Sequence, residues 1–222
     1  MIVAGKKPIE EIIEQVEPFS SILVAGCNEC VTVCEAGGKK EVGVIASALR
    51  MYFMNQGKEV KIDEITFERQ CDREFLEELR DRADRYDAIL SLACGAGVQF
   101  MAETYPSLPV FPGVNTSFIG VTEQRGLWTE RCQGCGDCIL GRTAGICPIS
   151  RCAKRLLNGP CGGSTKGKCE INKELDCAWQ LIIERLKELG RLEDYEKIIP
   201  IKDWSCERAG GPRKVVREDV IL

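Results

Sequence analysis

The first 125 residues alternate between helical and strand-like patterns of apolar positions. Amphipathic periodicity, typical of helices, covers residues 7–19, 38–57, 72–86 and 97–105, and strand-like apolar runs cover 21–26, 59–68, 87–95, 108–113 and 117–121. Strands separated by helices of this length predict parallel β-α-β units with right-handed crossovers. We therefore expect an α/β fold in which residues 1–125 form a small Rossmann-like three-layer domain with a parallel sheet.

The pattern changes after about residue 126. Glycine and proline crowd residues 132–169, and such a loop-rich stretch lacks the apolar residues to hold itself together, so an inorganic group is expected to organise it. One helix is predicted at 174–190, with Trp179 as a packing residue. Its apolar face comprises Ala178, Leu181, Ile182, Leu186 and Leu189. We assign 126–200 to a loop-rich, cysteine-rich domain ending in this helix, and 201–222 to an extended tail that packs on a neighbour or stays loose.

Composition narrows the chemistry through one excess and one absence. The 222 residues include 14 cysteines and no histidine. The absence excludes His-ligated zinc, Ser-His and Cys-His nucleophiles and a histidine general base. The chain shows no signal-peptide run and no apolar stretch of about 20 residues, so we expect a cytoplasmic protein without a membrane span. In that reducing compartment, dense cysteine indicates metal or redox sites rather than disulfides. The net charge of −4, with three Trp and four Tyr, gives no case for nucleic acid.

Five cysteines follow the predicted strands of the α/β half. Cys27, Cys30 and Cys34 come after the first strand, Cys71 after the second and Cys94 after the third. The carboxyl ends of parallel strands share one edge of a sheet, where ligands bind, so these thiols are expected to converge on a metal site. The alternative is that Cys71 and Cys94 are small buried hydrophobes. Five candidates for four ligand positions leave one thiol spare.

The second half carries a C-x2-C-x2-C run at Cys132, Cys135 and Cys138, the spacing of bacterial ferredoxins. The Cys-Pro pair at 147 follows nine residues after Cys138, further away than in a ferredoxin repeat. Four more thiols follow at Cys152, Cys161, Cys169 and Cys177. Eight cysteines suffice for two four-thiolate sites. We expect two [4Fe–4S] clusters here and a third in the α/β half, with zinc as the alternative at one site. Cys206, in the tail, is expected to be spare.

The distribution of charged residues is compatible with iron–sulfur clusters in the second half, but it has another explanation as well. Between residues 131 and 170 there are seven Lys or Arg and two acidic residues, although the whole chain is acidic. Cations near a four-thiolate cluster would offset its negative charge and raise its potential. The alternative is that Arg142, Arg151, Lys154 and Arg155 form a solvated face or a docking patch.

The stretch CQGCGDCILGRTAGICPISRCAKRLLNGPCGGSTKGKCE, followed by CAW at 177–179, resembles the cysteine-rich C-terminal domain attached to, or encoded beside, some bacterial methylenetetrahydrofolate reductases. That likeness spans about residues 130–190. The earlier stretches CNECVTVCEAGGKKEV, ERQCDRE and ACGAGVQ look like the preceding part of its free-standing version, the small MetV-type subunit. All eight cysteines from Cys132 to Cys177 stand at positions of the motif.

The resemblance implies a non-catalytic iron–sulfur subunit of an oxidoreductase complex. Its implied partner is a TIM-barrel, flavin-containing (FMN or FAD) MetF-type subunit, which reduces methylenetetrahydrofolate to methyltetrahydrofolate in one-carbon metabolism, as in the Wood–Ljungdahl pathway. Nothing in this chain alone indicates folate or flavin binding.

Three functions are compatible with the sequence. The first is electron transfer, in which clusters relay electrons between a donor such as ferredoxin and the partner flavin. The second is a zinc-stabilised structural or regulatory scaffold of the same reductase. The third makes the α/β half catalytic, through an open iron site or a nucleophilic thiolate. It ranks last because no acid–base partner is evident, and Glu29 and Glu35 are read as solvated loop residues.

Overall fold

A computed structural model describes residues 1–220. The chain divides into two compact units, the first formed by residues 1–128 and the second beginning at Thr129. Each unit is described by itself. No helix in the described part of the chain is long and apolar enough to cross a membrane.

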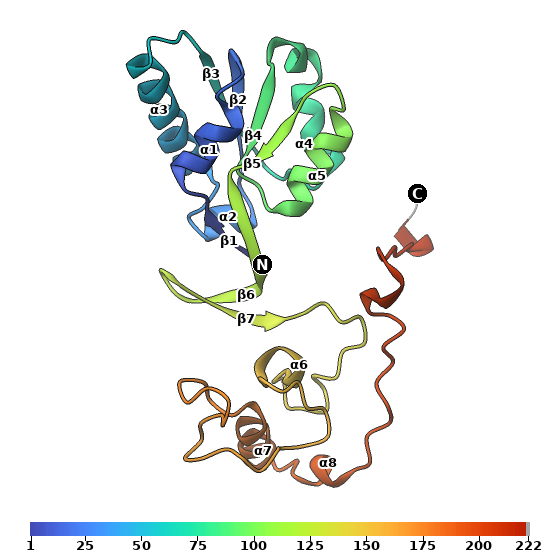
Figure 1. Cartoon of the computed structure of the whole chain (residues 1–222). Helices are drawn as coiled ribbons and strands as arrows, with labels where there is room; N and C mark the ends of the chain where they lie inside the picture. Colours follow the sequence, from blue (N-terminus) through green and yellow to red (C-terminus); the bar gives the residue numbers. More distant parts are fainter. Residues whose placement is uncertain (221–222) are drawn as a thin grey trace. The chain divides into compact units, whose positions relative to one another are not determined.

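The first unit is built on a four-stranded parallel sheet (Figure 1). The strands are β2 (Ser21–Cys27), β3 (Lys61–Phe67), β4 (Ala88–Ser91) and β5 (Val110–Pro112). Their order across the sheet is β3-β2-β4-β5, and each pair is parallel. The chain therefore leaves β2 for one neighbour, β3, and then crosses to the other side of β2 to form β4.

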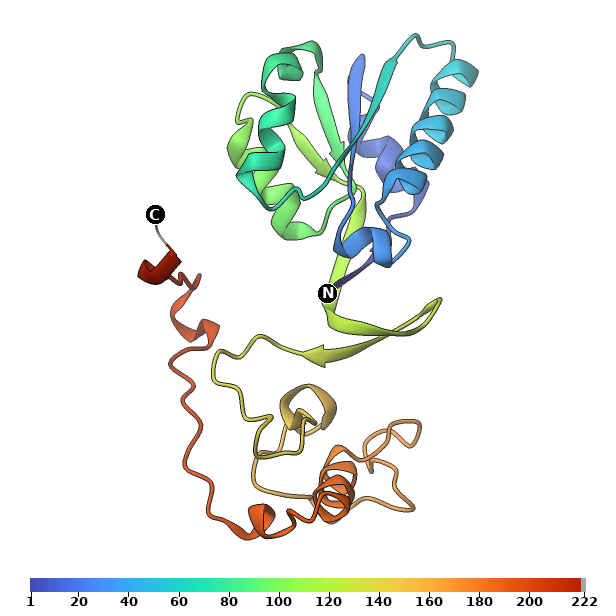
Figure 2. The same ribbon diagram turned by 180° about the vertical axis from the view of Figure 1, so that it is seen from behind.

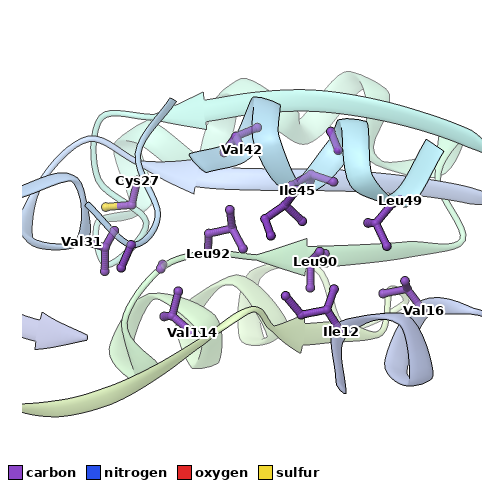
Figure 3. Packing of buried hydrophobic residues seen from close by; sticks show 14 of the residues in the cluster. Ile12, Val16, Cys27, Val31, Val42, Ile45, Leu49, Leu90, Leu92 and Val114 are labelled. Atoms are coloured by element: carbon purple, nitrogen blue, oxygen red, sulfur yellow. The ribbon is translucent and has the colours of Figure 1, made fainter. Parts of the chain in front are cut away.

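Helices cover both faces of this sheet, as Figures 1 and 2 show from opposite sides. On one face α1 (Ile9–Val16) and α3 (Lys39–Asn55) pack through residues such as Ile12, Ile45 and Leu49 (Figure 3). On the other face lie α4 (Arg73–Leu76), the 3-10 helix η1 (Glu77–Arg85) and α5 (Gly95–Thr104). Alternate residues of β2 point to opposite faces of the sheet. Ile22 and Val24 pack on the face covered by α1 and α3, and Leu23 and Ala25 pack on the other face. The three-layer α/β prediction is confirmed.

One predicted strand belongs to a different sheet. The run at 117–121, expected as a last strand of the parallel set, lies within β6 (Val114–Gln124), which pairs antiparallel with β1 (Ile2–Lys6). A third strand, β7 (Leu127–Cys132), completes this sheet in the order β1-β6-β7. The pattern of apolar positions indicated neither β1 nor β7. For β1 the reason is that the strand depends on a partner more than 100 residues away.

The charged segment 72–86 differs from an ordinary α-helix. Its first turn is α4, but most of it is the 3-10 helix η1. The buried side chains Leu76, Leu79 and Ala83 still belong to one core cluster. The spacing of three residues suits both helix types, whereas the spacing of four is that of an α-helix. The segment therefore buries apolar side chains as expected, but most of its backbone is wound more tightly than an α-helix.

The second unit has little regular structure. Its helices are α6 (Pro148–Arg151), α7 (Ala178–Glu188), α8 (Glu193–Glu196), η2 (Arg208–Gly210) and η3 (Glu218–Val220). The apolar core comprises Ala144, Trp179, Ile182 and Leu186. Trp179 packs there as expected, and its indole N–H donates to the Leu156 carbonyl at 2.9 Å. At roughly 2 kcal/mol for each large buried side chain, so small a core is weak support for some 90 residues.

Candidate metal centre

The cysteines of the first unit gather at the carboxyl edge of the parallel sheet. Cys27 is the last residue of β2, and Cys30 begins the short helix α2 (Cys30–Val33). Cys71 follows β3, and Cys94 follows β4 as the residue that precedes α5. Because β3 and β4 lie on opposite sides of β2, this edge holds the topological switch point, where open α/β sheets bind ligands.

Four of these thiols lie close enough to influence one another's ionisation. Burial raises the pKa of Cys27, and negative charge on Cys94 or Cys30 raises it further, against N–H donation from Glu29 and Gln70. Burial also raises the pKa of Cys71, again with contributions from Cys94 and Cys27. Thiols that resist ionising side by side would be stabilised as thiolates by a shared metal group. Cys27, Cys30, Cys71 and Cys94 therefore form the first thiol set.

Cys34 is the fifth thiol and stands apart. Its S–H lies 3.5 Å from the carbonyl oxygen of Ile2, toward which it donates. Burial raises its pKa, and the one cysteine that adds to this shift is Cys30. Cys71 is exposed, which is contrary to its alternative reading as a small buried hydrophobe. Cys34 is thus placed near Cys30 and the β1 backbone, with no influence from Cys27, Cys71 or Cys94 on its pKa.

A buried glutamine, not indicated by the sequence patterns, fixes the loop that carries Cys71. Gln70 is 0% exposed, and its amide nitrogen donates to the carbonyl oxygens of Ala25 at 3.0 Å and Gly26 at 2.8 Å. Its amide oxygen accepts from the buried hydroxyl of Ser91 at 2.7 Å. One side chain therefore ties the ends of β2 and β4 to the residue before Cys71. The available signal was a Gln at a strand exit, next to a cysteine.

The loop from Cys27 to Gly38 is held by a close backbone approach. The amide of Cys27 donates to the Gly37 carbonyl at 2.9 Å. A Cβ added at Gly37 would lie 1.8 Å from the carbonyl oxygen of Leu92, so only glycine fits there. In Figure 3, Cys27, Val31 and Leu92 lie toward the end of the sheet to which the strand arrows point. This contact keeps the loop of the first two thiols against the exit of β4.

Four cysteines of the second unit line one pocket. They are Cys152, Cys161, Cys169 and Cys177, and Arg151, Lys154 and Trp179 complete part of its wall. We name these four the pocket set. In the described part of the chain, neither Cys147 nor Cys206 is among the residues that line this pocket.

The pocket set is supplied with hydrogen-bond donors suited to thiolates. The amide of Gly163 lies 3.4 Å from Cys161 Sγ. The backbone N–H groups of Asn172 and Ile171, and more weakly Lys173 and Lys154, lower the pKa of Cys169. Such N–H···S donation is typical of cysteines that ligate metals, because it stabilises the charged sulfur. Lys154 also forms an ion pair with Glu170. Arg142 and Arg155 are exposed, so the alternative that some of these basic side chains form a solvated face stays open.

The C-x2-C-x2-C run forms a separate loop. The amide of Gly134 lies 3.3 Å from Cys132 Sγ, and the Cys135 thiol lies 3.6 Å from the Asp137 carbonyl. Cys138 is exposed. Cys147 precedes α6, and the Ser150 hydroxyl of that helix donates to the Arg131 carbonyl at 2.9 Å. Cys206 reaches the same loop from the tail, with its thiol 3.6 Å from the Cys135 carbonyl.

Among residues 1–220, no three Cys, Asp or Glu side chains stand close enough to hold a single metal ion. A single zinc ion needs sulfurs at about 2.3 Å from the metal. A bound group must therefore span a wider set of sulfurs, or draw the loops together as it binds. The donor chemistry fits an all-thiolate group, because each set combines cysteines with backbone N–H donors.

Two acidic residues near the first set, Glu35 and Glu29, are each paired with an arginine. Glu35 forms an ion pair with Arg125 at 2.7 Å, and this guanidinium lowers the pKa of the Glu35 carboxyl. Glu29 lies 3.7 Å from Arg69 and is half exposed. Because Arg125 favours the ionised form of the Glu35 carboxyl, Glu35 is poorly suited to act as a general acid near neutral pH.

A protein-family model described as "Methylene-tetrahydrofolate reductase C terminal" matches residues 111–205. The match covers somewhat less than half of the chain. It includes the C-x2-C-x2-C loop, Cys147 and the pocket set, and it ends one residue before Cys206. No curated protein matches the sequence. This chain thus carries, over residues 111–205, a domain related to the C-terminal region of methylenetetrahydrofolate reductases.

Proposed function

We propose that this chain is an electron-transfer iron–sulfur subunit of a methylenetetrahydrofolate reductase complex. It would relay electrons between a donor such as ferredoxin and the flavin (FMN or FAD) of a MetF-type catalytic subunit. The observation that carries the proposal is the grouping of the pocket set, four thiols with N–H donors, inside the segment that matches the reductase family.

Each proposed cluster has its own ligands. In the first unit these are Cys27, Cys30, Cys71 and Cys94, which converge at the switch point of the sheet. In the second unit the pocket set would hold one cluster, and the C-x2-C-x2-C loop would supply three ligands of another. The use of several four-thiol sites in so short a chain favours a relay over a purely structural role.

The chain's own residues would bind and tune these groups. A bound [4Fe–4S] cluster supplies one-electron transfer at a potential set by its surroundings. Around the pocket set, Gly163 and the 171–172 backbone donate to sulfur, and Lys154 and Lys173 add positive charge, which favours the more reduced, more negative state. Around the first set, burial of Cys27 disfavours negative charge and so would favour the less reduced state of a bound cluster. Two sites with different potentials would suit a relay.

Folate and flavin would belong to the partner. The contribution of this chain would be to receive electrons at one site and deliver them at another. The reducing cytoplasm is the proposed compartment, because it keeps the 14 thiols available as ligands.

The test is metal analysis of protein purified without oxygen. Iron and acid-labile sulfide in similar amounts, with a broad visible absorption band that a reductant bleaches, would support the relay. Mixing the reduced protein with an oxidised flavin-containing reductase subunit should then transfer electrons to the flavin. Zinc without iron would refute the proposal and leave the scaffold function in its place.

A further inference from the structure

Part of the tail lies along the C-x2-C-x2-C loop of the same unit. The Lys202 amino group donates to the Asp137 carbonyl at 2.5 Å, and the amide of Asp203 lies 3.3 Å from the Asp137 carboxylate. Further along, the Arg213 guanidinium donates to the Gly134 carbonyl. Contacts at both ends of the segment 202–213 therefore hold it against residues 134–137.

Between these contacts, Cys206 packs directly on the loop glycine. A Cβ added at Gly136 would lie 2.7 Å from the Cys206 carbonyl oxygen and 3.0 Å from both its Cβ and its sulfur. Gly136 also has φ +89°, a conformation that strongly favours glycine. The space over Gly136 is thus filled by Cys206, and its thiol lies 3.6 Å from the carbonyl of Cys135.

A buried cation adjoins the same thiols. Lys202 is 8% exposed, and its amino group donates to the backbone carbonyl of Asp137, which lies between Cys135 and Cys138. Its carboxylate neighbour, Asp137, stands 3.5 Å away and is itself 44% exposed. Burying an ammonium is costly unless negative charge compensates it, and a group held by thiolates would supply that charge.

The ligand count leads to the same residue. The C-x2-C-x2-C loop offers three thiols, and a four-thiolate cluster needs one more. The pocket set accounts for four of the remaining cysteines, which leaves Cys147 and Cys206. Cys206 contacts Cys135 and Gly136 inside the loop, whereas the helix after Cys147 contacts Arg131, just before the loop. The sequence alone indicated that Cys206 was spare.

We propose that Cys206 is the fourth ligand of the cluster held by Cys132, Cys135 and Cys138, so that the tail is fastened by the cluster. This proposal rests on the proposed iron–sulfur function. The Lys202 ammonium compensates the negative charge of the group. Cys147 is then a nearby thiol that does not ligate this cluster.

The test compares Cys206→Ala with Cys147→Ala in the full chain, purified without oxygen. Three clusters would give about twelve irons per chain. Cys206→Ala should lose about four irons, roughly a third of the total, whereas Cys147→Ala should keep them all. Far-UV circular dichroism checks that both variants are folded.

A second readout does not depend on metal content. Limited trypsin digestion should cut at Arg208, Arg213 and Lys214 several-fold faster in Cys206→Ala than in the wild type, because the tail loses its attachment. Full iron content in Cys206→Ala would overturn the proposal, whatever Cys147→Ala does. A wild-type protein without iron would overturn the proposed function as well, so the two failures are distinguishable.

Discussion

Replacing Gln70 with leucine removes the hydrogen bonds that join three strand exits while keeping a side chain of similar size. The bonds lost are those to the carbonyls of Ala25 and Gly26 and from the Ser91 hydroxyl. Gln70 and Ser91 are both fully buried, so water cannot replace these partners. At about 1 kcal/mol for each bond, the free energy of unfolding should fall by about 3 kcal/mol.

The assay is urea denaturation of the metal-free full chain, followed by far-UV circular dichroism, because the first unit contains most of the regular structure. Gln99→Leu is the matched control. Its amide also donates one bond, to the Gly95 carbonyl at 3.0 Å, but the residue is exposed, so the change should stay within about 0.5 kcal/mol. In the metal-loaded protein, Gln70→Leu should also weaken retention of the first cluster, because the Cys71 loop loses its support. An unfolding free energy within about 1 kcal/mol of the wild type, with iron fully retained, would refute this account of Gln70.

Three further predictions concern individual positions. Gly37→Ala should destabilise the first unit by roughly 3 kcal/mol or more, because the new Cβ meets a carbonyl oxygen at 1.8 Å; urea denaturation measures this, and an unchanged midpoint would contradict it. Cys71→Ser should cost about four irons while Cys34→Ser costs none, as iron analysis would reveal; the reverse result would mean that Cys34 and not Cys71 is the ligand. In the metal-free chain, Cys169 should react faster with iodoacetamide than Cys27 at neutral pH, since its pKa is lowered and that of Cys27 is raised; mass spectrometry of the labelled peptides measures both rates, and equal rates would argue against the N–H donors.

The parallel sheet could be predicted from the sequence because its signals are local. Each strand is a short apolar run followed by a turn, and Cys27, Cys71 and Cys94 lie at or shortly after the ends of β2, β3 and β4. The edge strand β1 was missed, since its five residues gain their identity from β6, far along the chain. The tighter geometry of η1 was missed because the four-residue spacing of its buried residues Leu79 and Ala83 is that of an α-helix.

The candidate sites were predictable as residue types and less so as groupings. Nothing in the composition separates Cys34 from the other four thiols of its half, because its partner is a backbone carbonyl of β1. Likewise, Gln70 has no periodic signature, and its role depends on two strand exits meeting around it. Cys206 lies in a segment without periodicity, and its place depends on a glycine with positive φ some 70 residues earlier.

The separation of the thiol sets along the chain has a consequence for biosynthesis. The four thiols of the first set lie between residues 27 and 94, within a unit that ends at Trp128. If they hold a metal group as proposed, this unit would be able to fold and to receive that group while later residues are still being synthesised. The C-x2-C-x2-C loop, by contrast, stays incomplete until residue 206 has left the ribosome, if the tail thiol closes it. Premature release of the nascent chain would then yield a protein with a loaded first site and an open last one.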